Sequence, residues 1–392
     1  MSTVWQTTNK SRKKLTADIK TLLDAASATD WLGPKTAPVL LKPNLVVSKP
    51  ASGGATTHPE VAAGIVEYLI DSGYSNIAVA EGSWVGDSTA RAFRICGYND
   101  LAEKYGIKLI DLQQDKAVDI SINSENFKVC ETIAALEYNE GSLINMPVLK
   151  GHGQTLLTCA LKNIKGCIPD TEKRRYHSLG VHRPLAMINT VIKPAFSLVD
   201  GLNGDPTWEE GGSPEKRDLL LLGRDPVSLD VHACRLLNIA PESVSYIALA
   251  DELGVGSAEI SEDDIVYLNN APKTTADKAP HNQKDTEIRD WINSIVDQRS
   301  ACSACFGNLA QALKELYETK GEKAMSTEFP RDKKSILIGQ DFKGMELPDD
   351  KTGIGICACG KEVFGSDVMN NNTVRTLKGC PPSQAAIKKY LS

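Results

Sequence analysis

The sequence lacks the long apolar runs that membrane-spanning and secreted proteins need. It contains no stretch of about 18 uninterrupted apolar residues, the minimum for a membrane helix. Residues 1–14 hold no apolar core of signal-peptide length. We therefore expect a cytoplasmic protein with no membrane partner. Basic residues are not in excess either, because the net charge of the 392 residues is −6, which argues against a nucleic-acid partner.

Several catalytic signatures are absent as well. The patterns G-x-S-x-G, H-E-x-x-H and G-x-G-x-x-G do not occur, which removes the usual hydrolase, zinc protease and dinucleotide-binding motifs. Residues 82–89 (GSWVGDST) follow a predicted strand and open a predicted helix, an arrangement whose backbone N–H groups can hold a phosphate. The lysine of a P-loop is missing there, so the sequence does not predict an NTPase.

The patterns that are present predict an α/β protein. Short apolar runs alternate with helical patterns from Val39 onward. The predicted buried strands are 39–41, 77–80, 107–110, 143–146, 196–199 and 219–222, and helices are predicted at 88–95, 155–164, 226–237 and 243–253. This alternation is typical of an open, mostly parallel sheet covered by helices, and we assign it to residues 1–268.

A second, smaller domain is predicted after a polar segment. Residues 269–285 contain prolines and lysines and almost no large apolar side chain, as expected of a linker or long surface loop. Apolar residues then recur at helical spacing, at Ile288, Trp291, Ile292 and Ile295. Since roughly 150 residues per domain is the usual size, we expect residues 286–392 to form a separate, cysteine-rich α/β module.

Five of the ten cysteines lie in that module at ligand-like spacing. Cys302 and Cys305 form a C-x-x-C, Cys357 and Cys359 form a C-x-C, and Cys380 precedes two prolines. In a chain without a secretion signal, thiolates grouped in this way indicate a metal or cluster site. The favoured ligands are Cys302, Cys305, Cys357 and Cys380, with Cys359 as the alternate.

The number of ligands does not separate an iron–sulfur cluster from zinc, because both bind four thiolates. Zinc ribbons usually present two C-x-x-C knuckles, and this chain has one. A single cysteine followed by proline resembles the ligand turns of cluster proteins, in which proline shields the cluster from water. We therefore expect one [4Fe-4S] cluster and keep zinc as the alternative. The simplest reading, that these are buried thiols only, is the least favoured.

A second candidate site is predicted in the larger domain. Residues 145–152 (NMPVLKGH) leave a predicted strand, and ligands of open α/β sheets bind at the carboxyl ends of strands. Lys150 and His152 are therefore placed where a site forms. Lys162 and Lys165 are three apart on a predicted helix and would add positive charge for a carboxylate or phosphate ligand. The alternative is that these lysines are exposed and that His152 and His177 are ordinary surface or core histidines.

His58 is expected to have a local structural role instead. It lies between Thr57 and Glu60, which are spaced as the N-cap and third residue of a capping box. We therefore expect this segment to begin a helix.

The order and spacing of several short motifs resemble a known family. These motifs are Leu41-Lys42-Pro43-Asn44-Leu45, Thr57-His58-Pro59-Glu60, Glu81-Gly82, residues 147–152 (PVLKGH), residues 161–166 (LKNIKG), and Arg224-Asp225-Pro226 with Asp230. Residues 38–255 thereby resemble the family catalogued as domain of unknown function 362, and the terminal cysteines resemble the cluster-binding tail of some members.

The resemblance implies an iron–sulfur protein, commonly of anaerobic metabolism, with no settled reaction for the family. Many relatives also carry a ferredoxin insert of the C-x2-C-x2-C-x3-C-P type. This chain lacks the insert, which implies a single cluster. The family is also distantly similar to nickel-pincer lactate racemases, and Lys150, His152 and His177 can be compared with the lysine and histidines around their cofactor, although the order and spacing differ.

The leading hypothesis is an oxidoreductase or electron-transfer protein that acts on a small anionic molecule and takes electrons from a donor such as ferredoxin or flavodoxin. The expected catalytic residues are Lys150, His152 and His177, and the expected substrate-binding residues are Lys42, Asn44, Lys162, Asn163 and Lys165. The alternatives are a zinc-stabilised racemase-like or transferase enzyme, and a non-enzymatic cluster carrier in which Cys359 assists transfer. A homodimer is left open.

Overall fold

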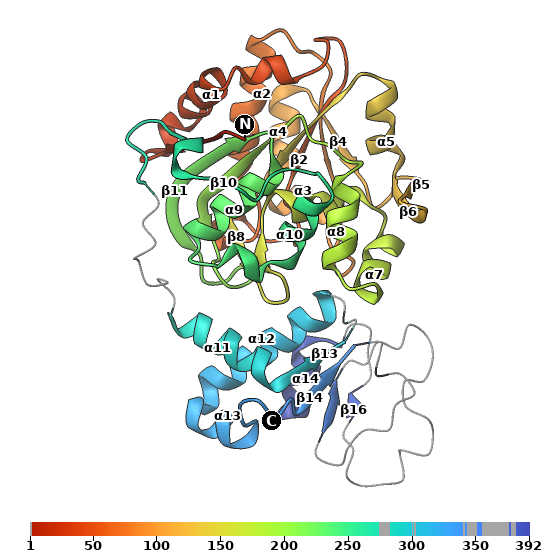
Figure 1. Cartoon of the computed structure of the whole chain (residues 1–392), viewed down its shortest axis with the longest axis vertical. Helices are drawn as coiled ribbons and strands as arrows, with labels where there is room; N and C mark the ends of the chain where they lie inside the picture. The colour runs from red at the N-terminus through yellow and green to blue at the C-terminus, as the bar shows by residue number, and fades with distance from the viewer. Residues whose placement is uncertain are drawn as a thin grey trace. The chain divides into compact units, whose positions relative to one another are not determined.

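The computed structural model describes residues 2–273, 283–299, 301, 303–339, 342, 351–354, 376–377 and 382–392 (Figure 1). The chain divides into two compact units. The larger unit comprises residues 1–173 and 182–281, and the smaller unit comprises residues 174–181 and 282–392. The predicted linker, 269–285, includes residues 274–282, which lie outside the described residues. Its character stays a prediction.

Within the described residues, the larger unit contains an eight-stranded sheet in the order β12-β1-β11-β10-β7-β2-β3-β4. All neighbouring strands are parallel except β11, which runs antiparallel to β1 and β10. The strands are β1 (Val4–Thr8), β2 (Val39–Pro43), β3 (Ile77–Glu81), β4 (Lys108–Asp111), β7 (Ser142–Met146), β10 (Phe196–Gly204), β11 (Glu215–Gly223) and β12 (Ile265–Tyr267). A mixed α/β fold with a large, mostly parallel sheet is thus confirmed, and the six predicted strands correspond to β2, β3, β4, β7, β10 and β11.

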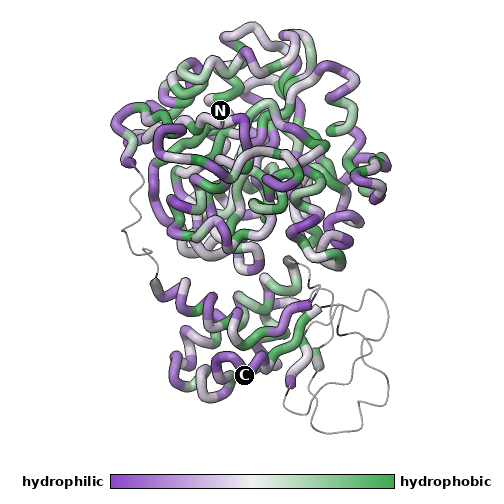
Figure 2. The backbone as a smooth tube through the Cα atoms, viewed as in Figure 1, coloured by the Kyte–Doolittle hydropathy of each residue, from purple (hydrophilic) through white to green (hydrophobic). Residues whose placement is uncertain are grey.

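Helices cover both faces of this sheet. Side chains of alternate strand residues, such as Val39 and Leu41, join α1, α2 and α4 in one buried apolar cluster, while α6 contacts β7 and α9 contacts β11 on the other face. The helices of the larger unit are α1 (Leu15–Ala25), α2 (Pro59–Asp71), α3 (Thr89–Ile95), α4 (Tyr98–Tyr105), α5 (Glu131–Tyr138), α6 (Ala160–Asn163), α8 (His182–Asn189), α9 (Pro226–Leu236) and α10 (Ser245–Glu252). Hydrophobic stretches accordingly recur through the middle of the unit in Figure 2.

The helix predicted at 155–164 is wrong. Leu156–Thr158 form β9, which pairs antiparallel with β8 (Lys150–His152), and only α6 and a 3-10 turn at Ile164–Cys167 follow. Leu156 has a φ of 64°, a left-handed conformation that a regular helix cannot contain. The local sequence of residues 155–164 is typical of a helix, but residues 156–158 instead form the second strand of the β8–β9 hairpin. A second hairpin joins β5 (Ala117–Ile122) to β6 (Glu125–Cys130).

The smaller unit has a parallel sheet of its own. In the residues described, its strands are ordered β13-β14-β15-β16, and every neighbouring pair is parallel. They are β13 (Val296–Gln298), β14 (Ile336–Ile338), β15 (Thr352–Ile354) and β16 (Thr376–Leu377), and the helices are α11 (Gln283–Ile295), α12 (Ser303–Lys320), α13 (Glu322–Glu328) and α14 (Gln384–Leu391). Helix α7 (Asp170–Ser178) contributes its residues from 174 onward to this unit. No helix among the described residues is both long and apolar enough to cross a membrane.

Candidate functional site

Buried polar side chains gather at the carboxyl edge of the larger sheet. β2, β3 and β7 are parallel neighbours, so their carboxyl ends meet at one edge. Lys42 lies near the end of β2 and Glu81 ends β3. Asn145 lies on β7, directly opposite Lys42 of β2. All three residues are at most 2% exposed. Because buried charges need partners, the contacts of these groups define the site.

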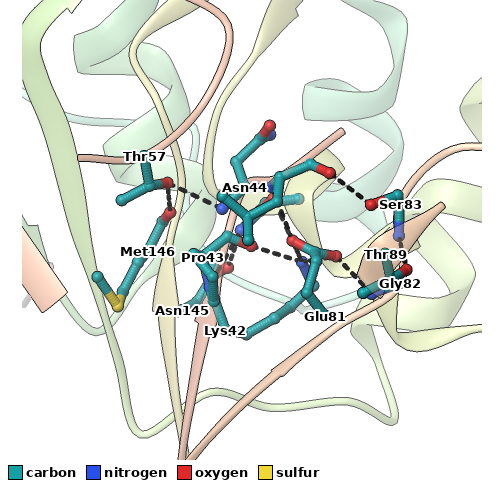
Figure 3. Close-up of polar contacts among 12 residues, drawn as sticks. Lys42, Pro43, Asn44, Thr57, Glu81, Gly82, Ser83, Thr89, Asn145 and Met146 are labelled. Carbon is teal, nitrogen blue, oxygen red and sulfur yellow. Dashed lines mark hydrogen bonds and ion pairs between the residues drawn. The ribbon is translucent and has the colours of Figure 1, made fainter. Parts of the chain in front are cut away.

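Lys42 and Glu81 form a buried ion pair (Figure 3). The Lys42 Nζ lies 2.9 Å and 3.0 Å from the two carboxylate oxygens of Glu81. The same carboxylate accepts backbone N–H groups from Leu45 (3.0 Å) and Gly82 (2.7 Å). A Cβ added to Gly166 would lie 2.3 Å from Glu81 Oε1 and 2.6 Å from Lys42 Nζ, so only glycine fits over the pair. The Lys42 charge is thus compensated within the protein.

Asn163 connects this ion pair to α6. Its Nδ2 donates to Asn145 Oδ1 (2.8 Å) and to the Lys42 carbonyl (3.3 Å). The position of α6 is set by Asp230, whose carboxylate accepts the N–H of Ala160 at 2.6 Å. Burial raises the pKa of Asp230 to about 7. Asn163 is therefore positioned by α6, and the first residue of α6 is in turn held by the Asp230 carboxyl group of α9.

Lys150 lies in a different environment on the same side of the sheet. Its Nζ donates to Asn44 Oδ1 (3.2 Å) and to the carbonyl oxygens of Ala55 (2.5 Å) and Glu209 (2.8 Å). Three neutral oxygens thus surround the amine, and its side chain is fully buried. Burial lowers the pKa of Lys150 to about 7. Near neutral pH this amine can therefore exchange a proton.

His152 faces the carboxylate of Glu209. Its Nδ1 accepts the backbone N–H groups of Gln154 (2.9 Å) and Thr155 (3.2 Å), which places the proton of the neutral ring on Nε2. Nε2 lies 2.9 Å from Glu209 Oε2. Burial lowers the pKa of His152 to about 4. A Cβ on Gly151 would lie 2.1 Å from the Pro206 carbonyl oxygen, so glycine lets β8 approach the loop that carries Glu209.

Two adjacent glutamates complete this cluster. Glu209 Oε1 lies 2.5 Å from Lys162 Nζ. Burial acts to raise the pKa of Glu209, but the contacts with His152 and Lys162 outweigh it and hold the pKa well below the usual range. Burial and the neighbouring Glu209 raise the pKa of Glu210 to about 7. We call Lys150, His152, Lys162, Glu209 and Glu210 the lysine–histidine cluster. Its groups have pKa values pushed in opposite directions, which is typical of proton-transfer sites.

The capping box expected around His58 is wrong. Helix α2 begins at Pro59, and no side chain caps it. The Thr57 hydroxyl instead donates to the Met146 carbonyl at 2.7 Å (Figure 3). The His58 Nδ1 lies 2.7 Å from Asp200 Oδ2. Burial acts to lower the pKa of His58, but the Asp200 carboxylate outweighs it, so the pKa is raised.

The structure brings most of the predicted catalytic and substrate-binding residues together in two groups. Lys150, His152 and Lys162 contact Glu209, and Asn44 contacts Lys150. Lys42 contacts Glu81 and Asn163. Lys165 is half-buried in the 3-10 turn that follows α6, so it does not share one regular helix with Lys162. His177 belongs to the α7 residues that group with the smaller unit, and its side chain lies outside the described part.

Sequence reasoning missed the acidic partners. Glu81 ends an otherwise apolar strand (IAVAE), and a charged residue at the end of a buried strand was a usable signal. Glu209 and Asp200 gave none, because they lie 57 and 142 positions from the histidines that they contact.

Of the five candidate cysteines, the structure describes one. Cys305 is buried in the first turn of α12, whereas Cys302, Cys357, Cys359 and Cys380 lie outside the described residues. Among the residues that are described, no three His, Cys, Asp or Glu side chains form a metal-binding group. The cysteine ligand set therefore stays a prediction.

The fold and the buried charges define a class of protein: a mixed α/β protein with a buried cluster of charged side chains at the carboxyl edge of its main sheet. Residues 39–235 match the family model described as "Domain of unknown function (DUF362)", and the chain belongs to this family. The family resemblance predicted from the motifs is confirmed. Over 251 residues the chain is 24% identical to the "Thylakoid-associated protein sll1697" of Synechocystis sp., covering 62% of this chain and 75% of that protein. No solved structure matches the chain.

Proposed function

We propose that this chain is an iron–sulfur oxidoreductase or electron-transfer protein that acts on a small anionic molecule. The smaller unit would bind one [4Fe-4S] cluster, and the lysine–histidine cluster of the larger unit would bind the substrate and supply a proton. The observation that carries the proposal is the topology of the smaller sheet. The family and the α/β fold are compatible with this function without specifying it.

All candidate cysteines follow strands that end at one edge. Cys302 comes four positions after the last residue of β13, Cys357 three after β15, and Cys380 three after β16. Since β13 to β16 are parallel, their carboxyl ends share an edge. Three or four residues span at most about 10–14 Å, and three strand spacings of about 4.8 Å separate β13 from β16. The chain segments that carry the cysteines are therefore short enough to meet at one site.

A described hydrogen bond supports the same arrangement. Asn308, one turn after Cys305 on α12, donates from Nδ2 to the Pro382 carbonyl at 2.9 Å. Pro382 is two positions after Cys380. The start of α12 and the chain beyond Cys380 are thus neighbours, which fits Cys302, Cys305, Cys357 and Cys380 as ligands with Cys359 as the alternate. A [4Fe-4S] cluster held there would supply one-electron transfer, with ferredoxin or flavodoxin as the donor.

In the larger unit, each residue has a distinct proposed task. The Lys150 amine, whose pKa is about 7, would pair with the anionic group of the substrate and supply the proton, and the neutral His152 ring would donate a hydrogen bond to the substrate from Nε2–H. Lys162 holds the Glu209 carboxylate beside the ring, and Asn44 holds the Lys150 amine. Lys42 and Asn163 fix the loops after β2 and β7, and Lys165 adds positive charge beside them.

The test is the metal content of the full chain purified without oxygen. We expect about four irons and four acid-labile sulfides per chain, and a broad visible band that fades with dithionite. Cys305→Ser should lose most of the iron, while the matched control Cys96→Ser, a buried cysteine of the larger unit, should keep it. Stoichiometric zinc without iron or sulfide would overturn the proposal.

The lysine–histidine cluster also favours a second function. A buried amine with a pKa of about 7 beside a neutral imidazole suits removal and return of a proton next to a carboxylate. This is the chemistry of a racemase-like enzyme and needs no electron transfer. Zinc in the metal analysis would favour it, because the smaller unit would then have a structural site.

A further inference from the structure

A separate pocket of about 640 Å³ lies at the opposite edge of the larger sheet. Its wall includes residues that precede β10, residues around the start of β1, and residues that follow β11. Register pairs Val4 and Ser197 with Gly223, so the start of β1, the start of β10 and the end of β11 lie side by side. Volumes of about 300–1,000 Å³ are typical of small-molecule sites. No residue of the lysine–histidine cluster or of the Lys42–Glu81 pair lines this pocket.

The wall offers flat aromatic surfaces. The rings of Trp5 and Trp31 line the pocket with centroids 5.6 Å apart and planes tilted by 52°. Both side chains are half-buried. The indole of Trp31 also packs edge-on against Phe196, which fixes its position. Rigid, partly covered indoles are suited to stacking a ring of a ligand.

The charge of the pocket is positive. Arg224 and Lys193 line it, both are exposed, and neither forms an ion pair with any residue that the structure describes. The Arg224 guanidinium lies over the Trp31 ring, 5.6 Å from its centroid, a contact that leaves its charge without a carboxylate partner. The wall also includes the carboxylate of Asp225, which is already bonded. Its Oδ1 accepts the N–H groups of Val227 and Ser228, and its Oδ2 accepts Ser257 N–H and the Ser2 hydroxyl. The two cations are therefore available to an anion.

One buried acceptor in the wall has no donor. Asn189 is 3% exposed, and its Nδ2 donates to the carbonyls of Leu161 (3.0 Å) and Leu185 (2.8 Å). Both N–H bonds are thus used, which fixes the orientation of the amide. Its Oδ1 has no hydrogen-bond partner within the described part of the chain. This oxygen has less than 1 Å² of accessible surface, so it lies behind the pocket wall, and the Asn189 amide serves to hold the end of α8 against α6.

We propose that this pocket is a second ligand site, for a small aromatic or heteroaromatic molecule that carries an anionic group. The ring packs against Trp5 and Trp31, and the anion pairs with Arg224 and Lys193. The site is independent of the proposed function, because it uses none of the residues assigned to the cluster or to the anionic substrate.

The experiment uses indole-3-acetate as the probe, because it combines an aromatic ring and a carboxylate. Binding to the full chain is followed by saturation-transfer NMR and titration calorimetry. We expect indole-3-acetate to bind, and neutral indole-3-acetamide to bind about tenfold more weakly, as the loss of one charge-assisted hydrogen bond implies.

The variant Arg224→Gln/Lys193→Gln should also weaken indole-3-acetate about tenfold. Both side chains are exposed, so folding should be kept, and an unchanged melting temperature checks this. Lys104→Gln, at an exposed lysine on α4, is the matched control and should bind as the unchanged protein does. Absence of binding at millimolar probe, or equal binding by the double variant and the control, would overturn the proposal.

Discussion

Two buried lysines at the same edge of the sheet are stabilised in different ways. Lys42 contacts both oxygens of the Glu81 carboxylate, whereas Lys150 contacts three neutral oxygens. In the interior, an ion pair offsets the desolvation cost of both charges. A charge that is surrounded only by neutral dipoles retains most of that cost, which disfavours its charged form. The comparison teaches that the Lys42 charge is compensated within the fold, whereas burial without a carboxylate contact lowers the pKa of Lys150 to about 7.

The largest expected effect comes from removing the countercharge of Lys42. Glu81→Gln should lower the free energy of unfolding by about 3–5 kcal/mol, because a buried ammonium group is left uncompensated. Denaturant unfolding measures the change. Glu131→Gln is the control, since its partner Lys116 is 3.9 Å away and both side chains are exposed, and its effect should stay within about 0.5 kcal/mol. If the two variants were equally stable, the structural role of Lys42 would be wrong.

Removing the Lys150 amine should have a smaller effect. Lys150→Met leaves three oxygen acceptors without a donor but no uncompensated charge, so we expect a loss of about 1–3 kcal/mol. Lys42→Met, measured in the same way, strands the Glu81 carboxylate and should cost about 3–5 kcal/mol. The distinction between the two lysines would be wrong if Lys150→Met lowered the free energy of unfolding more than Lys42→Met does.

The pH dependence of stability sharpens the same distinction. The pKa of Lys150 is lowered from 10.5 to about 7 in the folded protein, so the unfolded chain binds more protons between these values. Stability relative to Lys150→Met should therefore rise with pH from about 7 to 10.5, with a slope of at most ~1.4 kcal/mol per pH unit. Unfolding of both proteins across this range gives the difference. A flat difference would show that the Lys150 pKa is not lowered.

The smallest effect compares two histidines instead of two lysines. His58 faces the Asp200 carboxylate and has a raised pKa, whereas burial lowers the pKa of His152 to about 4. NMR titration should show His58 changing charge above pH 6.5, the ordinary pKa of a histidine, and His152 staying neutral with its proton on Nε2. Stability from the His58–Asp200 pair is fully present below pH 6.5 and is lost as pH rises through the folded pKa. Reversal of the two titrations would contradict the assignment.

Much of the fold could be predicted because its strands are buried on both faces. Runs such as IAVA at 77–80 and LINM at 143–146 read as strands from local sequence alone. The position of Lys150 and His152 at the carboxyl edge of the sheet could also be predicted, because they follow directly after a predicted parallel strand.

Which charged groups pair could not be predicted from local sequence, because the partners lie far apart in the chain. Glu81 is 39 positions from Lys42, and Asp200 is 142 positions from His58. The predicted helix at 155–164 failed for a similar reason. The cap that starts α6 at Ala160 comes from Asp230, 70 positions further along the chain, and local periodicity does not contain that information.

The place of β1 in the sheet has a consequence for synthesis on the ribosome. This strand precedes the rest of the sheet in the chain, lies between β11 and β12 and pairs with Leu219–Gly223 and Ile265–Tyr267. Its partners are therefore translated more than 200 residues later. Until residue 267 has left the exit tunnel, the nascent larger unit has an open sheet edge, which is a site for mispairing and a binding surface for chaperones.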